Sequence, residues 1–348
     1  MPRRLTVLCY LDLIQDLDVL LPVILAARDD ARLNVRVIVA RWLAAGAPRV
    51  GRILKSHDIR FCYVPRRNVV AGRGPSLWGV GAVLTASESD QPTHTAGYAL
   101  TIRARNRDIP TFTLQHGLDS LGGGARFASA HVFSWFAPDH VPEGLTQETL
   151  GKLLPVGRPM IERQNDAVEF DVGVFENLHA EVYSEIERER FVSSLDTVLD
   201  LRHNNSFLIR PHPAGRWLDS VRPRLHRHRN ATLVPPSGSL ADLTPGYHEV
   251  GQARRVISTP STIALDAAMA GRPGALALPG SGPYASLPVL ADVPAWLDFV
   301  DGRLDTSFGR DGLRLLDSIM TQGDPVARII DHIANAPASV KAPGPNFR

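Results

Sequence analysis

Two hydroxyl side chains and one carboxylate stand out in a segment built almost entirely of alanine and aliphatic residues. The segment TPSTIALDAAMAGRP (259–273) follows the short apolar run 256–258 and reads as a helix. Ser261 or Thr262 can cap this helix, and the free amides of its first turn, with the helix dipole, can bind a phosphate. Asp266 lies one turn after Thr262 on the same face, about 6 Å along the axis, where it can hold ribose hydroxyls. The alternative is that the hydroxyls only cap the helix and that Asp266 is solvated.

A second candidate is the segment LIRPHPAGR, which places an arginine and a histidine at the end of an apolar run. Arg210 ends the run, and Pro211 and Pro213 restrict the backbone on both sides of His212. A histidine held beside an arginine suits a phosphate or a sugar hydroxyl, and the alternative is a rigid turn with an exposed histidine. The predicted donor-binding residues are therefore Arg210, His212, Ser261, Thr262 and Asp266.

The segment TFTLQHGLDS supplies a candidate base in the first half of the chain. His116 follows an apolar run directly, and Gly117 permits a sharp turn after it. An imidazole near neutrality can accept the proton of an acceptor hydroxyl within hydrogen-bond reach. Glu88 and Asp90, in the segment SESD after another apolar run, are rival bases or orient His116. The alternative is that His116 is structural, as strand-end histidines without partners commonly are.

Motifs of several other enzyme classes are absent from the sequence. No G-x-x-x-x-G-K-[ST] indicates a P-loop NTPase, no G-x-G-x-x-G follows the first apolar run, and no G-x-S-x-G forms a nucleophile elbow. The triplet 16–18 spells the metal motif D-x-D, but it reads as the start of a helix. Neither a metal nor a separate cofactor is therefore predicted.

The composition favours a soluble globular protein without a nucleic-acid partner. The 348 residues are 44% hydrophobic and 21% charged, and the formal net charge of +2 is too small to indicate nucleic acid. Cys9 and Cys62 each lie in an apolar run that reads as a buried strand, and their small number favours a reducing cytoplasm. The longest apolar run, 19–27, contains a proline and is too short for a bilayer. Membrane contact would be peripheral, through basic runs such as RPRLHRHR (222–229), which otherwise read as a solvated helix face.

Short apolar runs alternate with helical stretches along both halves of the chain, which indicates parallel sheets covered by helices. The predicted strands are 5–11, 35–40, 59–64, 80–86, 111–115 and 131–136, then 171–175, 206–213, 231–236, 255–259 and 274–279. Region 138–159, rich in proline and glycine, separates the two sets. We expect two Rossmann-like domains, 1–157 and 158–335, and a loose tail, 336–348. Ligands should bind outside the carboxyl ends of the strands.

Four segments in order resemble GT-B transferases of bacterial surface polysaccharide synthesis, among them the CDP-glycerol glycerophosphotransferase and capsule polysaccharide transferase groups. They are IPTFTLQHG, PVGRP, LIRPHP and VISTPSTIALDAAMAGRP, and the resemblance spans residues 80–279. It implies a GT-B-like α/β fold with the nucleotide donor on the second domain and the acceptor on the first. It further implies that His116 acts as base or on the acceptor side. His212 and the pair Ser261 and Thr262 would contact the donor phosphate, with Asp266 further along the helix.

The sequence thus predicts an inverting, metal-independent transferase of the cytoplasm or of the inner face of the cell membrane. It would move a group from a nucleotide-sugar or CDP-linked donor to a hydroxyl of a cell-surface glycan or lipid-linked acceptor. One alternative is a nucleotide-sugar 2-epimerase, which needs more acidic groups around the sugar than Glu88, Asp90 and Glu176. The other alternative is a non-catalytic nucleotide-binding module with the same fold.

Overall fold

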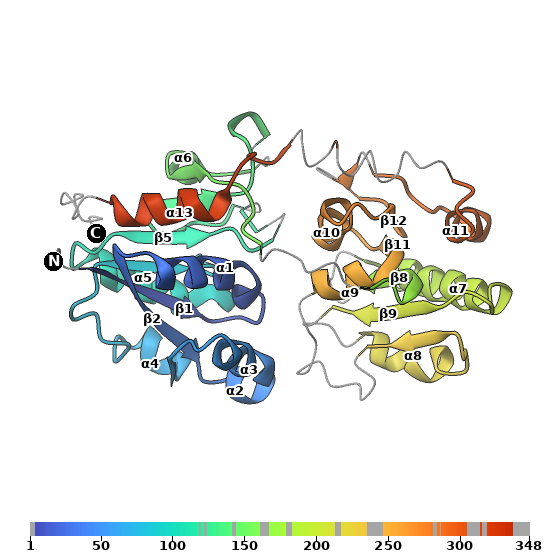
Figure 1. Cartoon of the computed structure of the whole chain (residues 1–348), viewed down its shortest axis with the longest axis horizontal. Coiled ribbons are helices and arrows are strands. Elements are labelled where there is room, and N and C mark those ends of the chain that lie inside the picture. The colour runs from blue at the N-terminus through green and yellow to red at the C-terminus, as the bar shows by residue number, and fades with distance from the viewer. Residues whose placement is uncertain are drawn as a thin grey trace. The chain divides into compact units, whose positions relative to one another are not determined.

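The computed structural model divides the chain into two compact units, and Figure 1 shows strands and helices in each. The first unit comprises residues 1–162 and 319–348, and the second comprises 163–318. The residues that the structure describes are 4–117, 120–121, 124–140, 144–160, 167–178, 183–212, 217–234, 246–280, 284–285, 287–304, 314 and 319–336.

The first unit is built on a seven-stranded parallel sheet in the order β3-β2-β1-β4-β5-β6-β7. Its strands are β1 (Leu5–Leu11), β2 (Leu33–Ala40), β3 (Phe61–Val64), β4 (Ala82–Thr85), β5 (Thr111–Leu114), β6 (His131–Ser134) and β7 (Leu153–Pro155). The central strands are near-continuous buried apolar runs because helices cover both faces of the sheet. The strand order reverses between β1 and β4, and open α/β sheets bind ligands at such a point.

Helices connect these strands, and one helix from the end of the chain joins them (Figure 1). They are α1 (Asp16–Asp29), α2 (Leu43–Gly46), α3 (Pro48–Ser56), α4 (Arg66–Val70), α5 (Thr95–Arg105), α6 (Gln147–Leu150) and α13 (Pro325–Ala334). Helix α13 packs beside α1 and buries Ile329, Ile330 and Ile333, which share one helix face. This helix lies within the second predicted domain, 158–335, whereas its apolar face is buried in the first unit.

The second unit is built on a five-stranded parallel sheet in the order β10-β9-β8-β11-β12. Its strands are β8 (Phe170–Glu176), β9 (Phe207–Pro211), β10 (Ala231–Leu233), β11 (Ala253–Ser258) and β12 (Gly274–Leu276). Its helices are α7 (Glu185–Leu201), α8 (Trp217–Leu225), α9 (Gly246–Gln252), α10 (Ile263–Met269) and α11 (Val293–Val300). The strand order reverses between β8 and β11, which gives this sheet its own switch point.

The predicted α/β class with two parallel sheets is confirmed, and one detail of the first sheet is wrong. Cys9 is buried in β1, but Cys62 is exposed. The reason is that β3, which contains Cys62, is the edge strand and lacks a neighbour on one side. The predicted loose tail lies, from residue 337 onward, outside the described residues.

The basic run 222–229 is held against α7 by ion pairs of two arginines and by a hydrogen-bond contact of His228. Asp196 of α7 receives Arg224 Nε at 3.0 Å, Arg227 Nη2 at 2.7 Å and His228 Nε2 at 2.7 Å. Part of the positive charge that was predicted to favour membrane contact is therefore neutralised within the second unit. Among the described residues, no helix has the length and apolar character needed to cross a bilayer.

Candidate active site

Polar side chains of the first unit gather just beyond the carboxyl ends of its three central strands. Asp12 follows β1, Ser87 and Ser89 follow β4, and His116 follows β5. Helix α5 packs closely on this edge, since a Cβ at Gly97 would lie 2.5 Å from the Ser87 carbonyl oxygen. The cluster therefore forms at the switch point of the sheet, where the fold is expected to bind a ligand.

His116 is partly buried, and its ring has a fixed tautomer. Its Nδ1 lies 3.0 Å from the carbonyl oxygen of Ala86. A carbonyl oxygen only accepts, so Nδ1 donates its proton there and Nε2 of the neutral ring keeps a lone pair. Burial lowers the pKa of His116, and the bond to Ala86 opposes this only in part. The ring is therefore neutral at pH 7 and can accept a proton on Nε2, as the sequence analysis requires of a base.

His94, which the sequence analysis does not single out, packs against His116. The two rings meet edge to face, with centroids 5.4 Å apart and planes at 86°. His94 Nδ1 lies 2.7 Å from Ser89 Oγ. Burial, with the charges of His116 and Arg66, lowers the pKa of His94 to about 4. His94 is therefore neutral at pH 7 and helps to fix the ring of His116.

Glu88 and Asp90 both bond to the segment that follows β5. Buried Glu88 accepts hydrogen bonds from the amides of Ala128 at 2.7 Å and Ser129 at 3.3 Å, and from the Ser129 hydroxyl at 2.7 Å. Asp90 is exposed and accepts from the amide of Arg126 at 3.0 Å. Both carboxylates thus anchor the 126–129 segment, and neither hydrogen bonds to His116 in the described part of the chain. These two residues do not orient His116, because its ring is held by the carbonyl oxygen of Ala86.

Asp12 is a buried carboxylate that the sequence analysis misses. Its Oδ1 accepts from the Tyr10 hydroxyl at 3.1 Å and pairs with Arg66 Nε at 2.9 Å. Burial raises the pKa of Asp12 to about 7, with Arg66 opposing the rise and Asp16 adding to it. The signal available in the sequence was the position of Asp12 directly after the first apolar run.

Asp16 begins α1, as the D-x-D triplet was predicted to do. It accepts hydrogen bonds from the amides of Asp12 at 2.7 Å and Leu13 at 2.9 Å, and from the Ser87 hydroxyl. Burial raises its pKa to about 6, opposed by these bonds. Asp16 therefore ties the loop after β1 to the loop after β4.

The second unit places the predicted hydroxyl pair at the start of a short helix. Helix α10 begins at Ile263, Thr262 is its N-cap without a side-chain cap bond, and Ser261 Oγ accepts from the Ile263 amide at 3.3 Å. The Asp266 amide donates to the Thr262 carbonyl at 3.1 Å, so the two side chains are one turn apart. Ser261 and Thr262 are partly exposed, whereas Asp266 is 3% exposed. The alternative of a solvated Asp266 is therefore wrong.

The loop that leads into α10 is fastened to the end of β8. Thr259 is buried, its amide donates to the Phe175 carbonyl at 3.1 Å, and its Oγ1 accepts from the Asn177 amide at 2.8 Å. Glu176 is also buried, and its Oε2 accepts from the Leu178 amide at 2.7 Å. These bonds place the start of α10 at the switch point between β8 and β11.

Arg210 and His212 lie at the carboxyl end of β9, as predicted. Arg210 is buried and forms an ion pair with Glu249 of α9, which is also buried. Its charge is thus balanced inside the second unit by a residue that the sequence analysis misses. His212 is the first residue after β9 and is partly buried. Contact of either residue with a donor phosphate stays a prediction.

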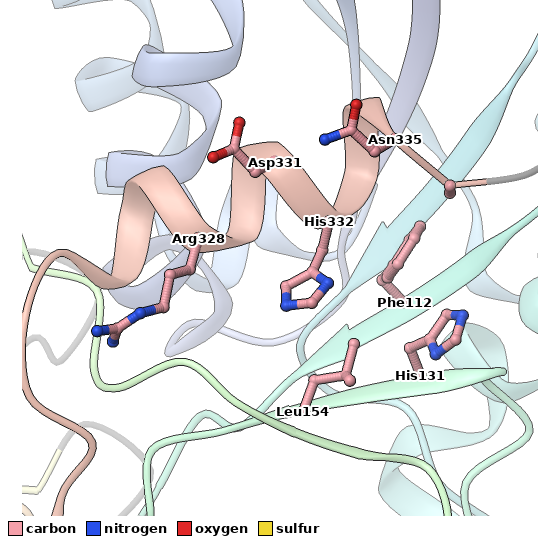
Figure 2. Close-up of a pocket in the computed structure, with 8 residues that line it drawn as sticks. Phe112, His131, Leu154, Arg328, Asp331, His332 and Asn335 are labelled. Carbon is pink, nitrogen blue, oxygen red and sulfur yellow. The ribbon is translucent and has the colours of Figure 1, made fainter.

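A cavity of about 410 Å³ lies elsewhere in the first unit, between α13 and strands β5 to β7. Figure 2 shows His332 on the side of α13 that faces Phe112 and Leu154, with His131 on the neighbouring strand. Phe112 stacks on His131, with ring centroids 5.3 Å apart. None of the predicted site residues lines this cavity, so it does not belong to the candidate site.

No cluster of three or more histidine, cysteine, aspartate or glutamate side chains with the geometry of a metal site occurs in the ranges that the structure describes.

Comparison with known proteins relates the chain to others through its fold. Neither a family model nor a curated protein matches the sequence. The S. aureus protein MnaA, solved with UDP, matches with a TM-score of 0.64 at 12% identity, over 95% of this chain and 96% of MnaA. The UDP-GlcNAc 2-epimerase from Neisseria meningitidis matches with a TM-score of 0.58 at 14% identity, over 95% and 97% of the two chains. The spinosyn rhamnosyltransferase SpnG matches with a TM-score of 0.56 at 15% identity, over 94% and 100%. The chain has the GT-B fold, with two Rossmann-like sheets.

Proposed function

We propose that the chain is an inverting, metal-independent GT-B transferase that uses a nucleotide-activated donor and needs no separate cofactor. The observation that carries the proposal is the tautomer of His116, whose Nδ1 is held by the Ala86 carbonyl. This leaves Nε2 as a proton acceptor at the carboxyl edge of the first sheet. The motifs around His116 and α10 favour a hydroxyl of a cell-surface glycan or lipid-linked molecule as acceptor.

The proposed step is a direct displacement. The acceptor oxygen attacks the anomeric carbon of the donor sugar, and its proton passes to His116 Nε2. The bond from that carbon to the phosphate oxygen breaks, and the nucleotide leaves with the electron pair. With a CDP-linked glycerophosphate donor, the attacked atom is phosphorus and CMP leaves. In both versions one bond forms and one breaks, and no oxidant or metal is needed.

The donor side of the proposal lies in the second unit. Partly exposed Ser261 and Thr262 at the start of α10 would receive the nucleotide phosphate, and Asp266 one turn later would hold the ribose. Arg210, whose charge is paired with Glu249, and His212 at the end of β9 would donate hydrogen bonds to this phosphate. Hydrogen-bond donors fixed in advance on a growing negative charge are commonly worth about 3–4 kcal/mol each.

One observation favours the second candidate, a nucleotide-sugar 2-epimerase. The sequence offered few acidic groups for that chemistry, but the structure adds Asp12 and Asp16 to the edge that carries His116. The fold is also similar to that of the UDP-GlcNAc 2-epimerase from Neisseria meningitidis and to that of MnaA, which was solved with UDP.

Incubation with UDP- and CDP-linked donors, with and without an acceptor mixture, separates these candidates. A transferase releases nucleotide and extends the acceptor only when acceptor is present. An epimerase produces a new nucleotide sugar without acceptor, and that result would replace the proposed function. Nucleotide binding with no product from any pair would instead indicate the non-catalytic module.

A further inference from the structure

The first unit has a strongly basic segment beside the candidate base. Residues 31–87 contain nine arginines and one lysine but a single acid, Asp58, although the whole chain has a net charge of only +2. This segment contains β2 and β3, the two strands on one side of β1. Arg32 and Arg49 are paired with Asp30 and Asp18, outside this segment. Arg41 and Arg66 follow β2 and β3, and positive charge at that edge attracts anionic ligands.

Arg66 of this segment reaches the carboxyl edge of the sheet and is held there at two points. It follows the end of β3, and its Nε pairs with Asp12 at the end of β1. Since β2 lies between these strands, the Arg66 side chain crosses the end of β2. Its Nη2 donates to the carbonyl oxygen of Thr93, the residue before His94. Arg66 is thus placed next to the His94–His116 pair.

The guanidinium of Arg66 keeps donors available for a ligand. Nε and Nη2 are engaged, whereas Nη1 has no hydrogen-bond acceptor within the described residues, and the side chain is 33% exposed. Buried Asp12 on one side and a backbone carbonyl on the other therefore fix the orientation of a partly solvated cation. Arginine held in this way suits the planar oxygens of a carboxylate or the oxygens of a phosphate.

Two residues that follow β2 also lie at the carboxyl edge of this sheet. Exposed Arg41 follows β2, and its amide donates to the carbonyl of Val64 at 2.9 Å, two residues before Arg66. Trp42 is 39% exposed, and its Nε1 donates to the Asp12 carbonyl at 2.8 Å. An exposed indole fixed at its nitrogen offers an apolar surface for a sugar ring beside the arginines.

We infer that the acceptor is a sugar that carries a phosphate or a carboxylate, and that Arg66 binds this anionic group. The inference rests on the proposed function, because it assigns the acceptor to the unit that holds His116. It requires no covalent step beyond the one described above.

Three probes test the inference by ligand-observed NMR titration of the full chain: glucose 6-phosphate, glucuronate and glucose. We expect at least one charged sugar to bind about tenfold more tightly than glucose, as loss of one charged hydrogen bond predicts. Arg66→Gln should abolish this preference, and Arg66→Lys should retain part of it. The charged sugar that binds more tightly identifies the anionic group. Arg107→Gln is the matched control, because exposed Arg107 lies before β5, at the opposite edge of the sheet.

Removal of Arg66 alone leaves buried Asp12 without its ion-pair partner, so Asp12→Asn/Arg66→Gln is measured as well. It should show the same loss of preference with a melting temperature close to that of the wild type. Equal affinities for the three sugars, or a preference that survives both variants, would overturn the inference. Equal sugar binding together with Arg66-dependent binding to phosphatidylglycerol vesicles would assign the basic edge to a membrane instead.

Titration of the same samples with UDP and CDP separates this inference from the proposed function. Nucleotide binding without a preference for charged sugars overturns the inference and leaves the transferase proposal in place. Absence of nucleotide binding contradicts the proposed function and the acceptor assignment together.

Discussion

His116 is the residue on which the proposed chemistry depends, and its environment makes a pH prediction. A histidine acts as a general base only in its neutral form, and burial lowers the pKa of His116 below the ordinary value of about 6.5. Activity should therefore persist as the pH falls through 6.5 and disappear only below it, at the pKa of the folded protein. The profile of kcat/KM against pH for transfer from the active donor measures this.

His116→Gln should lower kcat by about 10²–10⁴-fold and leave nucleotide affinity unchanged. His131→Gln is the control, because His131 is partly buried but starts β6 and so lies at the other edge of the sheet. A fall in kcat/KM that is already complete at or above pH 6.5, or full activity of the His116 variant, would assign the base to another residue.

Glu88 is predicted to affect stability rather than chemistry. Glu88→Gln replaces one carboxylate oxygen, which accepts from Ala128 or Ser129, with an amide that cannot accept. The free energy of unfolding should fall by about 1–3 kcal/mol. Chemical denaturation measures this, with Asp90→Asn as the control, which we expect to change stability by less than about 0.5 kcal/mol because Asp90 is exposed. Loss of activity at unchanged stability would return Glu88 to the catalytic candidates.

The sequence identifies residues that follow strands but not the partners that decide their roles. His116 and Asp266 are recognisable because each stands at a fixed place relative to a predicted strand or helix. Glu88 reads as a candidate base because Ser129, which occupies its carboxylate, is 41 residues away. Asp12 is missed because its importance depends on Arg66, which only the pairing of β1, β2 and β3 brings near.

Helices α10 and α13 show what the sequence pattern predicts and what it leaves out. The α10 segment is recognisable because a strand, a hydroxyl pair and an apolar helix follow one another directly. The helical nature of 325–334 is equally plain, since buried isoleucines recur on one face. Its attachment to the first unit could not be predicted, because it depends on packing against α1, about 300 residues earlier in the sequence.

The packing of α13 predicts a stability change confined to the first unit. Ile333→Ala should lower the free energy of unfolding by about 2–5 kcal/mol, because the fully buried side chain would leave a cavity. Hydrogen exchange resolved by segment should show faster exchange in α1 and α13 and unchanged exchange in α7. Ile102→Ala is the control, since Ile102 is 39% exposed on α5. Equal loss of protection in α7 would contradict the assignment of α13 to the first unit.

The alternation of strands and helices along the chain is enough to predict two parallel sheets. This prediction is possible because buried parallel strands are short apolar runs with helices between them, and few other architectures have that pattern. The orders β3-β2-β1-β4-β5-β6-β7 and β10-β9-β8-β11-β12 place Asp12 and the start of α10 at switch points, and His116 and Arg210 on the next strand. The reaction is not fixed by this architecture, because one fold carries many activities.

The proposed function requires that a nucleotide binds where α10 begins, with its ribose held by Asp266. Isothermal titration of the wild type, Asp266→Asn and Met269→Ala with UDP, CDP and CMP tests it most directly. We predict that the wild type binds at least one of these nucleotides and that Asp266→Asn binds it about 10–100-fold more weakly, as loss of a charged hydrogen bond implies. Met269→Ala should bind like the wild type, because Met269 is 42% exposed at the other end of the helix. Absence of binding to all three nucleotides, or equal affinity in the Asp266 variant, would contradict the account.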